Sequence, residues 1–377
     1  MDRGGHVSTA SVQERVREHT AQSTPARIVG SGGWLDAGRP VRDGAPLSLA
    51  GDRAIVEYVA GDLTLTARAG ATLADIASAT ATEGQWLALD PFGAPGGTLG
   101  ATIATGSAGP LAHAFGTPRD TVLGLEVVTG NGEILRAGGR VVKNVAGFDL
   151  TRLFTGAWGT LAVITEATVR LRSRPEREES VALAVPAGDA LDAWLARLRA
   201  LPFTPLALEM VNAPLAAMLG LECQAIVLAR LGGNDDAVRA QRELLGALGD
   251  MRDVPALVWS ALGTIEPRGS AVARVSAQPS RLHAIWPVLS RIDDRSFAHA
   301  TVGRGVVRTV CALSDGDSTS RWLAAVGACE GTRIFERLPE RAWQGIPCRV
   351  EDRLSRAVRT AFDPARILNR GILGETA

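Results

Sequence analysis

The stretch from Gly96 to Glu166 decides the fold of this chain. It contains four glycine-bearing segments, which read GGTLG at 96–100, TGSAGP at 105–110, KNVAGFDL at 143–150 and GAWGTLAVITE at 156–166. Glycines at this density allow the backbone to approach a ligand closely, because no side chain stands in between. Consecutive backbone N–H groups in such turns form concave sites for anions. The pattern therefore predicts a ligand that carries phosphate groups.

The order and spacing of these segments resemble the FAD-binding domain of the vanillyl-alcohol oxidase and p-cresol methylhydroxylase (PCMH) superfamily. Within it, VKNVAGFDLTRL at 142–153 is similar to the glycolate oxidase GlcE-type subunit. The resemblance covers the first half of the chain and its last turn. It implies an α+β fold: a two-subdomain PCMH-type FAD-binding domain at 1–175, an α+β cap domain at 176–345, and a C-terminal segment at 346–377 that returns to the FAD domain.

The resemblance also implies which residues hold FAD. The loop after the first strand would wrap the pyrophosphate, and the second glycine loop would contact the phosphates again. The third would lie along the ribityl chain and the flavin ring, and the fourth would meet the cofactor through backbone atoms. A closing turn, in which Arg370 replaces the family's proline, would lie near the flavin. The expected cofactor-binding residues are Gly30, Ser31, Gly32, Gly33, Trp34, Gly96, Gly97, Thr98, Gly100, Ala101, Thr105, Gly106, Ser107, Gly109, Gly159, Val163, Ile164 and Asn369.

Two other features of the sequence bear on how the nucleotide is bound. A Rossmann fingerprint at 30–33 is excluded, because the third glycine is missing and the following residues, 36–40, cannot open a helix. His113 lies in the region where some relatives attach flavin covalently, but a single histidine there is more often structural. We therefore predict noncovalent FAD.

Composition narrows the classes of function. The chain has 377 residues, which favours two or three domains, and its 40 Lys and Arg balance 40 Asp and Glu. This balance argues against nucleic acid or an anionic bilayer as a partner. The start lacks the apolar core of a signal peptide, and no apolar run approaches the roughly 20 residues of a spanning helix. We expect a cytoplasmic protein, with peripheral contact at the inner membrane through partners left open.

The four cysteines, Cys223, Cys311, Cys329 and Cys348, have no C-x-x-C spacing. Neither a zinc site nor an iron–sulfur cluster is therefore predicted, and four buried reduced thiols are expected.

Local patterns predict the surrounding elements. In the first half we expect a helix capped by Thr72 and Asp75 and a hairpin through TGNG at 129–132, besides a helix at 12–19 and strands at 27–29, 54–58 and 63–68. The charged run 172–179 is interpreted as a solvated linker. Beyond it we expect strands at 180–185, 206–211, 224–231 and 302–313, helices at 190–201 and 237–248, and an amphipathic helix at 351–362 with Leu354, Val358 and Phe362 on one face.

Few side chains near the loops predict chemistry, and no catalytic residue is assigned. Arg119 and Asp120 could form a functional pair beside the third loop or an ordinary surface pair. Lys143 could supply positive charge to an anionic partner or to the flavin. Asn144 and Asp149 could brace their loop for the cofactor or simply hydrogen bond within it.

The expected cap offers little for substrate oxidation. Oxidation of a 2-hydroxy acid needs a base for the hydroxyl proton and a cation for the carboxylate. The cap contains His283 and His299 without the spacing of metal ligands, so no metal is predicted.

Two hypotheses follow. In the first, the chain is the GlcE-like FAD subunit of a glycolate or D-lactate dehydrogenase complex, beside a larger flavin subunit and an iron–sulfur subunit. In the second, it is a stand-alone FAD oxidoreductase that holds a carboxylate through Arg274 or Arg304. A cofactor-free scaffold is disfavoured, because each unneeded glycine would cost about 0.5–1 kcal/mol.

Overall fold

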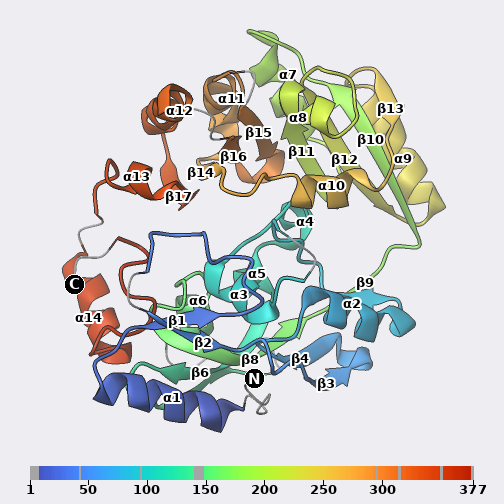
Figure 1. Ribbon diagram of the computed structural model, residues 1–377. Helices are drawn as coiled ribbons and strands as arrows, with labels where there is room; N and C mark the ends of the chain where they lie inside the picture. Colours follow the sequence, from blue (N-terminus) through green and yellow to red (C-terminus); the bar gives the residue numbers. More distant parts are fainter. Residues whose placement is uncertain are drawn as a thin grey trace. The chain divides into compact units, whose positions relative to one another are not determined.

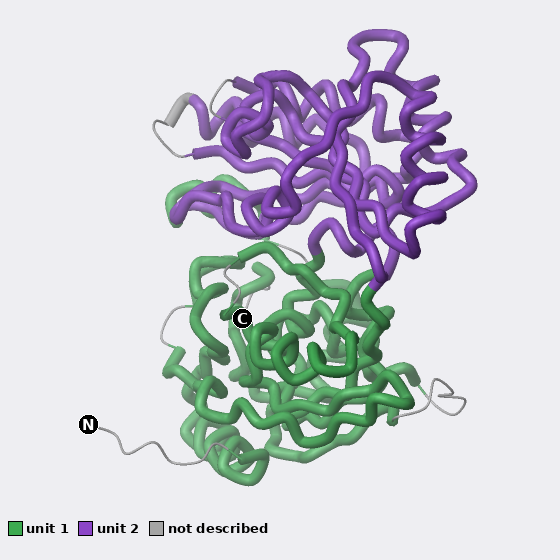
Figure 2. Tube along the Cα trace, turned by 90° about the vertical axis from the view of Figure 1, so that its right-hand side faces the viewer, with its two compact units in different colours: residues 1–108, 116–174, 340–377 green, residues 109–115, 175–339 purple. Residues whose placement is uncertain are grey.

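The computed structural model describes residues 8–41, 44–93, 96–139, 148–293, 296–312, 316–348 and 351–374. The chain forms two compact units, one drawn from residues 1–108, 116–174 and 340–377 and the other from 109–115 and 175–339 (Figure 2). Both units combine helices and strands, which confirms the expected α+β class. The divisions between the units fall at 174/175 and 339/340, and the end of the chain belongs to the first unit. The assignment of 109–115 to the second unit was not anticipated.

The first unit is built on an antiparallel five-stranded sheet with the strand order β3-β4-β8-β6-β7 (Figure 1). The predicted hairpin is confirmed as β6 and β7, in which Leu125 lies opposite Ala137. The strands are β3 (Ile55–Val59), β4 (Thr64–Arg68), β8 (Ala162–Arg170), β6 (Val122–Thr129) and β7 (Ile134–Gly138).

A smaller parallel sheet joins the start of the chain to its end. β1 (Ala26–Val29) pairs with β2 (Ala45–Ser48), and Leu368 forms a parallel bridge with Ala26. A two-stranded antiparallel pair, β5 (Gln85–Trp86) and β9 (Arg172–Ser173), also belongs to this unit. The helices of the first unit are α1 (Thr9–Ala21), α2 (Leu73–Thr80), α3 (Leu99–Thr105), α5 (Pro118–Thr121), α6 (Leu150–Phe154), α13 (Glu340–Trp343) and α14 (Arg353–Phe362).

Helix α2 begins as the sequence predicts. The Thr72 hydroxyl accepts a hydrogen bond from the Asp75 N–H at 3.1 Å, and the Asp75 carboxylate accepts one from the Thr72 N–H at 2.8 Å. This reciprocal capping box satisfies two amide groups that a helix start leaves without partners.

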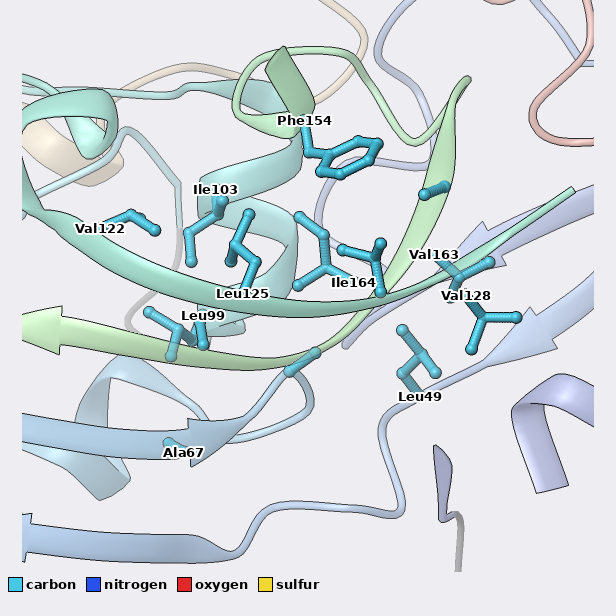
Figure 3. Packing of buried hydrophobic residues seen from close by; sticks show 14 of the residues in the cluster. Leu49, Ala67, Leu99, Ile103, Val122, Leu125, Val128, Phe154, Val163 and Ile164 are labelled. Atoms are coloured by element: carbon cyan, nitrogen blue, oxygen red, sulfur yellow. The ribbon is translucent and has the colours of Figure 1, made fainter. Parts of the chain in front are cut away.

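The core of the first unit lies between α3 and the five-stranded sheet. Leu99 and Ile103 of α3 pack in one buried cluster with Leu125 of β6 and Ile164 of β8 (Figure 3). Close packing of this kind gives little freedom of position. The loops at both ends of α3 are therefore attached to a rigid layer.

The second unit contains an antiparallel eight-stranded sheet with the order β13-β10-β12-β11-β15-β16-β14-β17 (Figure 1). Its strands are β13 (Met251–Asp253), β10 (Arg177–Ala184), β12 (Ile226–Gly233), β11 (Ala207–Val211), β15 (Ser296–Thr301), β16 (Val306–Cys311), β14 (Ala271–Ser276) and β17 (Thr332–Arg337). Its helices are α4 (Ala112–Phe115), α7 (Ala190–Arg199), α8 (Ala213–Met218), α9 (Asp235–Gly246), α10 (Val258–Thr264), α11 (Leu282–Leu289) and α12 (Gly316–Ala328). Among the described residues, no helix combines the length and apolarity needed to cross a lipid bilayer.

The structure corrects two predicted elements. The run 172–179 is not a linker, because β9 occupies its start and β10 begins at Arg177. Arginines from a neighbouring strand and a helix neutralise its charges: Arg230 of β12 donates to Glu178 at 2.7 Å, and Arg242 of α9 donates to Glu179 at 2.7 Å. The expected strand at 302–313 starts later, since a 3-10 turn (Val302–Arg304) and the left-handed Gly305, with φ of +62°, precede β16.

Two expectations about burial were wrong. Leu354 of α14 is 74% exposed, because the helix packs against the core through Val358 and Phe362 and its first turn does not. None of the four cysteines forms a disulfide, but Cys223 and Cys348 are exposed, while Cys311 and Cys329 are buried.

Candidate functional site

One cavity of the first unit gathers most of the predicted nucleotide-binding residues. Its empty space, including the part open to solvent, is about 730 Å³. Four parts of the chain form its walls: β1 with the loop that follows, helix α3, the segment 158–164 and the closing turn with Asn369 and Ile372.

The loop after β1 presents backbone amides to this cavity. Among the described residues, no hydrogen bond within the chain engages the N–H groups of Gly30, Ser31, Gly32 or Gly33. Gly32 has a φ of +90°, which glycine adopts without strain. A Cβ added at Gly33 would meet no atom within 4 Å, so open space lies beside it. Neighbouring unpaired amides of this kind suit an anion such as a diphosphate.

Helix α3 forms the second wall, and glycine determines how close it lies. A Cβ at Gly100 would come within 2.7 Å of the Ala69 Cβ, just after β4, and a Cβ at Gly30 would come within 2.4 Å of the Thr98 hydroxyl. Thr98 caps the helix by accepting from the Ala101 N–H at 3.3 Å. The two glycines therefore bring three segments together around the cavity.

Asn369 connects the remaining walls. Its side-chain oxygen accepts a hydrogen bond from the Ile28 N–H at 2.9 Å, and its amide nitrogen donates to the Trp158 carbonyl at 2.8 Å. Its own backbone N–H donates to the Ala26 carbonyl at 2.9 Å. The side chain is 5% exposed. Asn369 thus lines the cavity and fixes the position of β1 relative to the segment around Trp158.

Arg27 brings positive charge to the lining. Among the described residues that form the cavity, it alone is a cation. Burial lowers the pKa of its guanidinium, but the pKa of an arginine normally lies so far above neutrality that the charge is kept. Its long contacts to the carbonyls of Trp34 and Leu35, both 3.4 Å, place it at the end of the amide loop.

The structure brings most of the predicted cofactor residues together and leaves others apart. The cavity is lined by Gly30, Ser31, Gly32, Gly33, Trp34, Thr98, Gly100, Ala101, Thr105, Gly159, Ile164 and Asn369. The lining does not include Gly96, Gly97, Gly106, Ser107, Gly109 or Val163. Val163 is fully buried in the core, because neighbouring residues of β8 point to opposite faces and Ile164 takes the cavity side. Gly109 belongs to the second unit.

The sequence analysis missed several lining residues. They are Arg27, Ile28, Val29, Leu35, Leu49, Ala69, Ala104, Trp158, Ala162 and Ile372. Apolar residues at strand ends resemble core positions, so most gave no signal. Trp158 did give a signal, because it is a large side chain between the glycines of GAWG.

The polar candidates near the loops have structural partners. Arg119 donates to the Thr155 carbonyl at 3.2 Å, while Asp120 accepts from the Thr117 N–H at 2.8 Å as part of a capping box. Asp149 caps α6, accepting from the Arg152 N–H at 3.1 Å, and this agrees with hydrogen bonding within the loop. Lys143 and Asn144 lie outside the described residues.

His113 belongs to the second unit, where its ring lies against Gly303. A Cβ added to that glycine would come within 2.5 Å of the ring. Burial and the charge of Arg304 lower the pKa of His113 to about 4. The imidazole is therefore neutral at physiological pH.

The second unit contains a buried row of ionisable side chains across its sheet. His299 of β15 lies 2.6 Å from Glu209 of β11, and both side chains are almost fully buried. Opposite His299 in the ladder stands Arg308 of β16, which bonds to both Glu266 and Glu336. Burial disfavours the charge of Arg308, but the two carboxylates outweigh that effect and its pKa is raised.

Further arginines extend this row. Arg337 donates to Glu266 at 2.8 Å, and Arg274 lies 3.6 Å from Glu336. Among the described residues, no group of three or more His, Cys, Asp or Glu side chains could hold a metal ion. Each arginine of the row lies beside a carboxylate of the same unit.

The lining of the cavity in the first unit suits a nucleotide with an anionic centre. Unpaired amides and Arg27 suit a diphosphate, and apolar side chains such as Leu49 and Ile164 suit planar rings. Gly33 leaves space that any side chain would fill.

Comparison with known proteins agrees with this geometry. Residues 7–138 match the FAD binding domain family. The glycolate oxidase subunit GlcE of Escherichia coli (strain K12) is 35% identical over 254 residues, which is 66% of this chain and 66% of that protein. Subunit GlcD of Bacillus subtilis (strain 168) is 31% identical over 309 residues, 79% of this chain and 63% of that protein. The matches thus span just under two thirds of each relative.

A solved structure supports the fold. Substrate-bound p-cresol methylhydroxylase has a TM-score of 0.73 at 17% identity, covering 97% of this chain and 87% of that one. The chain therefore contains an FAD-binding domain, with FAD as its cofactor, and has the fold of p-cresol methylhydroxylase. In sequence it is similar to glycolate oxidase subunits, as the loop sequences indicated.

Proposed function

We propose that this chain is the FAD-binding, GlcE-like subunit of a 2-hydroxy acid dehydrogenase that acts on glycolate or D-lactate. The observation that carries the proposal is the cavity in which four consecutive amides, Gly30 to Gly33, have no partner among the described residues. Bound there noncovalently, FAD supplies the redox chemistry of an oxidoreductase. The similarity to GlcE and GlcD supports a hydroxy acid as the substrate.

The buried row of the second unit supports a subunit role over a stand-alone enzyme. A substrate carboxylate needs a cation that is not already neutralised. Arg308, which is almost fully buried, already holds Glu266 and Glu336, and Arg274 lies beside Glu336. In this proposal a larger, GlcD-like flavin subunit holds the hydroxy acid, and an iron–sulfur subunit carries electrons onward. The complex is cytoplasmic, with peripheral membrane contact through its partners.

The test is an anaerobic absorbance titration of the purified chain with glycolate and with D-lactate. We expect bound FAD that stays oxidised when the chain is alone and bleaches when the larger flavin subunit is added. Bleaching by the chain alone would favour the stand-alone enzyme, with Arg304, an exposed cap arginine, as a candidate carboxylate ligand. A chain without flavin would contradict the proposal.

A glycine substitution tests the location of the cofactor. Gly33→Ala adds a methyl group to open space without a clash inside the chain, so the fold should keep its melting temperature. If the diphosphate lies beside Gly33, the FAD dissociation constant should rise roughly tenfold or more, as for a misplaced methylene in a binding pocket. Gly61→Ala is the matched control, because its Cβ also meets no atom within 4 Å and it lies outside the cavity lining. Equal affinity of both variants would place the diphosphate elsewhere.

A further inference from the structure

Trp158 has an unusual backbone conformation for its size. Its φ is +57°, in the left-handed region, and Gly156 and Gly159 on either side have φ of +79° and +65°. Side chains disfavour this region, and bulky residues are rare in it. Glycine at position 158 would complete the turn without strain. The turn does not require a tryptophan at this position, so the indole ring points to a role outside the turn.

The backbone of Trp158 is held on both sides by distant residues. Its N–H donates to the Ala104 carbonyl at 2.7 Å, and its carbonyl accepts from the Asn369 side chain at 2.8 Å. Strained residues persist when their surroundings fix them in this way, and they concentrate at ligand sites. The indole is therefore presented from a fixed backbone.

The ring meets a second tryptophan from the opposite wall. Trp34 and Trp158 form an edge-to-face pair with centroids 6.1 Å apart and an interplanar angle of 86°. Both residues line the cavity, and Trp34 directly follows the loop of unpaired amides. In an edge-to-face pair, the ring that presents its edge keeps both of its own faces clear of its partner. Each indole therefore keeps at least one face that the other does not cover, and both residues line a site that suits a diphosphate.

We propose that Trp158, supported by Trp34, stacks on a heteroaromatic ring of the bound dinucleotide and so determines affinity for FAD. The inference rests on the proposed function, because it takes FAD as the ligand. Adenine and isoalloxazine are both planar rings attached to the diphosphate. An aromatic side chain stacks on the face of a planar ring and discriminates little between ring types. Either adenine or isoalloxazine could therefore be the partner of Trp158.

The experiment measures FAD binding and the melting temperature of the apoprotein for Trp158→Asn and Trp158→Gly. Both replacements suit a left-handed backbone, so the apoprotein should melt at or above the wild-type temperature. The FAD dissociation constant should rise at least about tenfold, since a stacked ring is lost. Trp158→Phe keeps an aromatic ring and should lose less. Trp343→Phe is the matched control, because it alters a buried indole of the same unit outside the cavity lining.

Two fragments identify which ring is stacked. ADP carries the adenine end and FMN the flavin end, and each is used to displace FAD from the wild type and from Trp158→Asn. A selective loss for either fragment supports the inference and assigns the ring. Trp158→Asn and Trp158→Gly that bind FAD within twofold of the wild type would overturn it. A wild-type chain that binds no FAD would instead overturn the proposed function.

Discussion

Replacing Asn369 by alanine removes the connection between the two walls of the cavity. The side chain bonds the Ile28 N–H and the Trp158 carbonyl, at 2.9 and 2.8 Å, and it is 5% exposed. Each backbone group left without its partner costs about 1 kcal/mol or more. The φ of Asn369 is +42°, which asparagine tolerates better than alanine does. We expect Asn369→Ala to lower the free energy of unfolding of the first unit by about 3 kcal/mol.

The assay is thermal unfolding of the apoprotein, followed by FAD titration. At about 2–4 °C per kcal/mol for a unit of this size, the melting temperature should fall by about 6–12 °C. FAD affinity should fall as well, because Ile28 and Trp158 lose their common support. Asn369→Gly should recover the part of the loss that comes from the backbone angle.

Arg370→Ala provides the matched control for Asn369. Arg370 is the exposed neighbour in the same turn, and its replacement should change neither property. An Asn369→Ala protein that melts within 1 °C of the wild type and binds FAD equally well would refute the reasoning.

Three further predictions concern other parts of the chain. Arg308→Ala should destabilise the second unit by about 3–5 kcal/mol in denaturant unfolding, because it leaves buried carboxylates unpaired. Arg281→Ala, which breaks an exposed ion pair, should cost less than about 1 kcal/mol. Burial lowers the pKa of His113 from 6.5 to about 4. Its contribution to the free energy of unfolding is therefore fully present above pH 6.5 and is lost as the pH falls towards 4, by at most about 3 kcal/mol. His113→Gln should flatten this pH dependence of unfolding. Gly100→Ala should lower both the melting temperature and FAD affinity, because its Cβ would lie 2.7 Å from the Cβ of Ala69.

Each of these predictions has a contradicting result. If Arg308→Ala and Arg281→Ala lowered the free energy of unfolding equally, the buried carboxylates would not depend on Arg308 for their stability. An unchanged pH dependence in His113→Gln would mean that another group titrates in that range. A Gly100→Ala protein with wild-type melting would show that α3 can move away from Ala69.

The sequence predicted those parts of the site that depend on local backbone chemistry. The glycine loops at 30–33 and 98–100 could be identified because glycine is what a close backbone approach requires. The capping box of Thr72 and Asp75 is equally local. The contribution of Trp158 could not be predicted, since its support comes from Ala104 and from Asn369, a residue 211 positions away.

The second unit was harder to predict for a different reason. Strands β14 and β15 carry the half-buried Arg274 and the buried His299, whose partners lie on other strands. A strand with polar residues on its buried face lacks the alternation that identifies strands in a sequence. The run at Arg177 was mistaken for a linker because its glutamates pair with arginines distant in sequence, Arg230 of β12 and Arg242 of α9.

The most direct test of the account is to purify the chain, release any bound chromophore with acid, and identify it, in parallel for the wild type and Gly33→Ala. We predict that the wild type carries FAD, that acid releases it intact because no covalent bond holds it, and that Gly33→Ala retains the fold but loses most of the flavin. Flavin that stays attached to the polypeptide, or full FAD occupancy in Gly33→Ala, would contradict noncovalent binding beside the amide loop at 30–33.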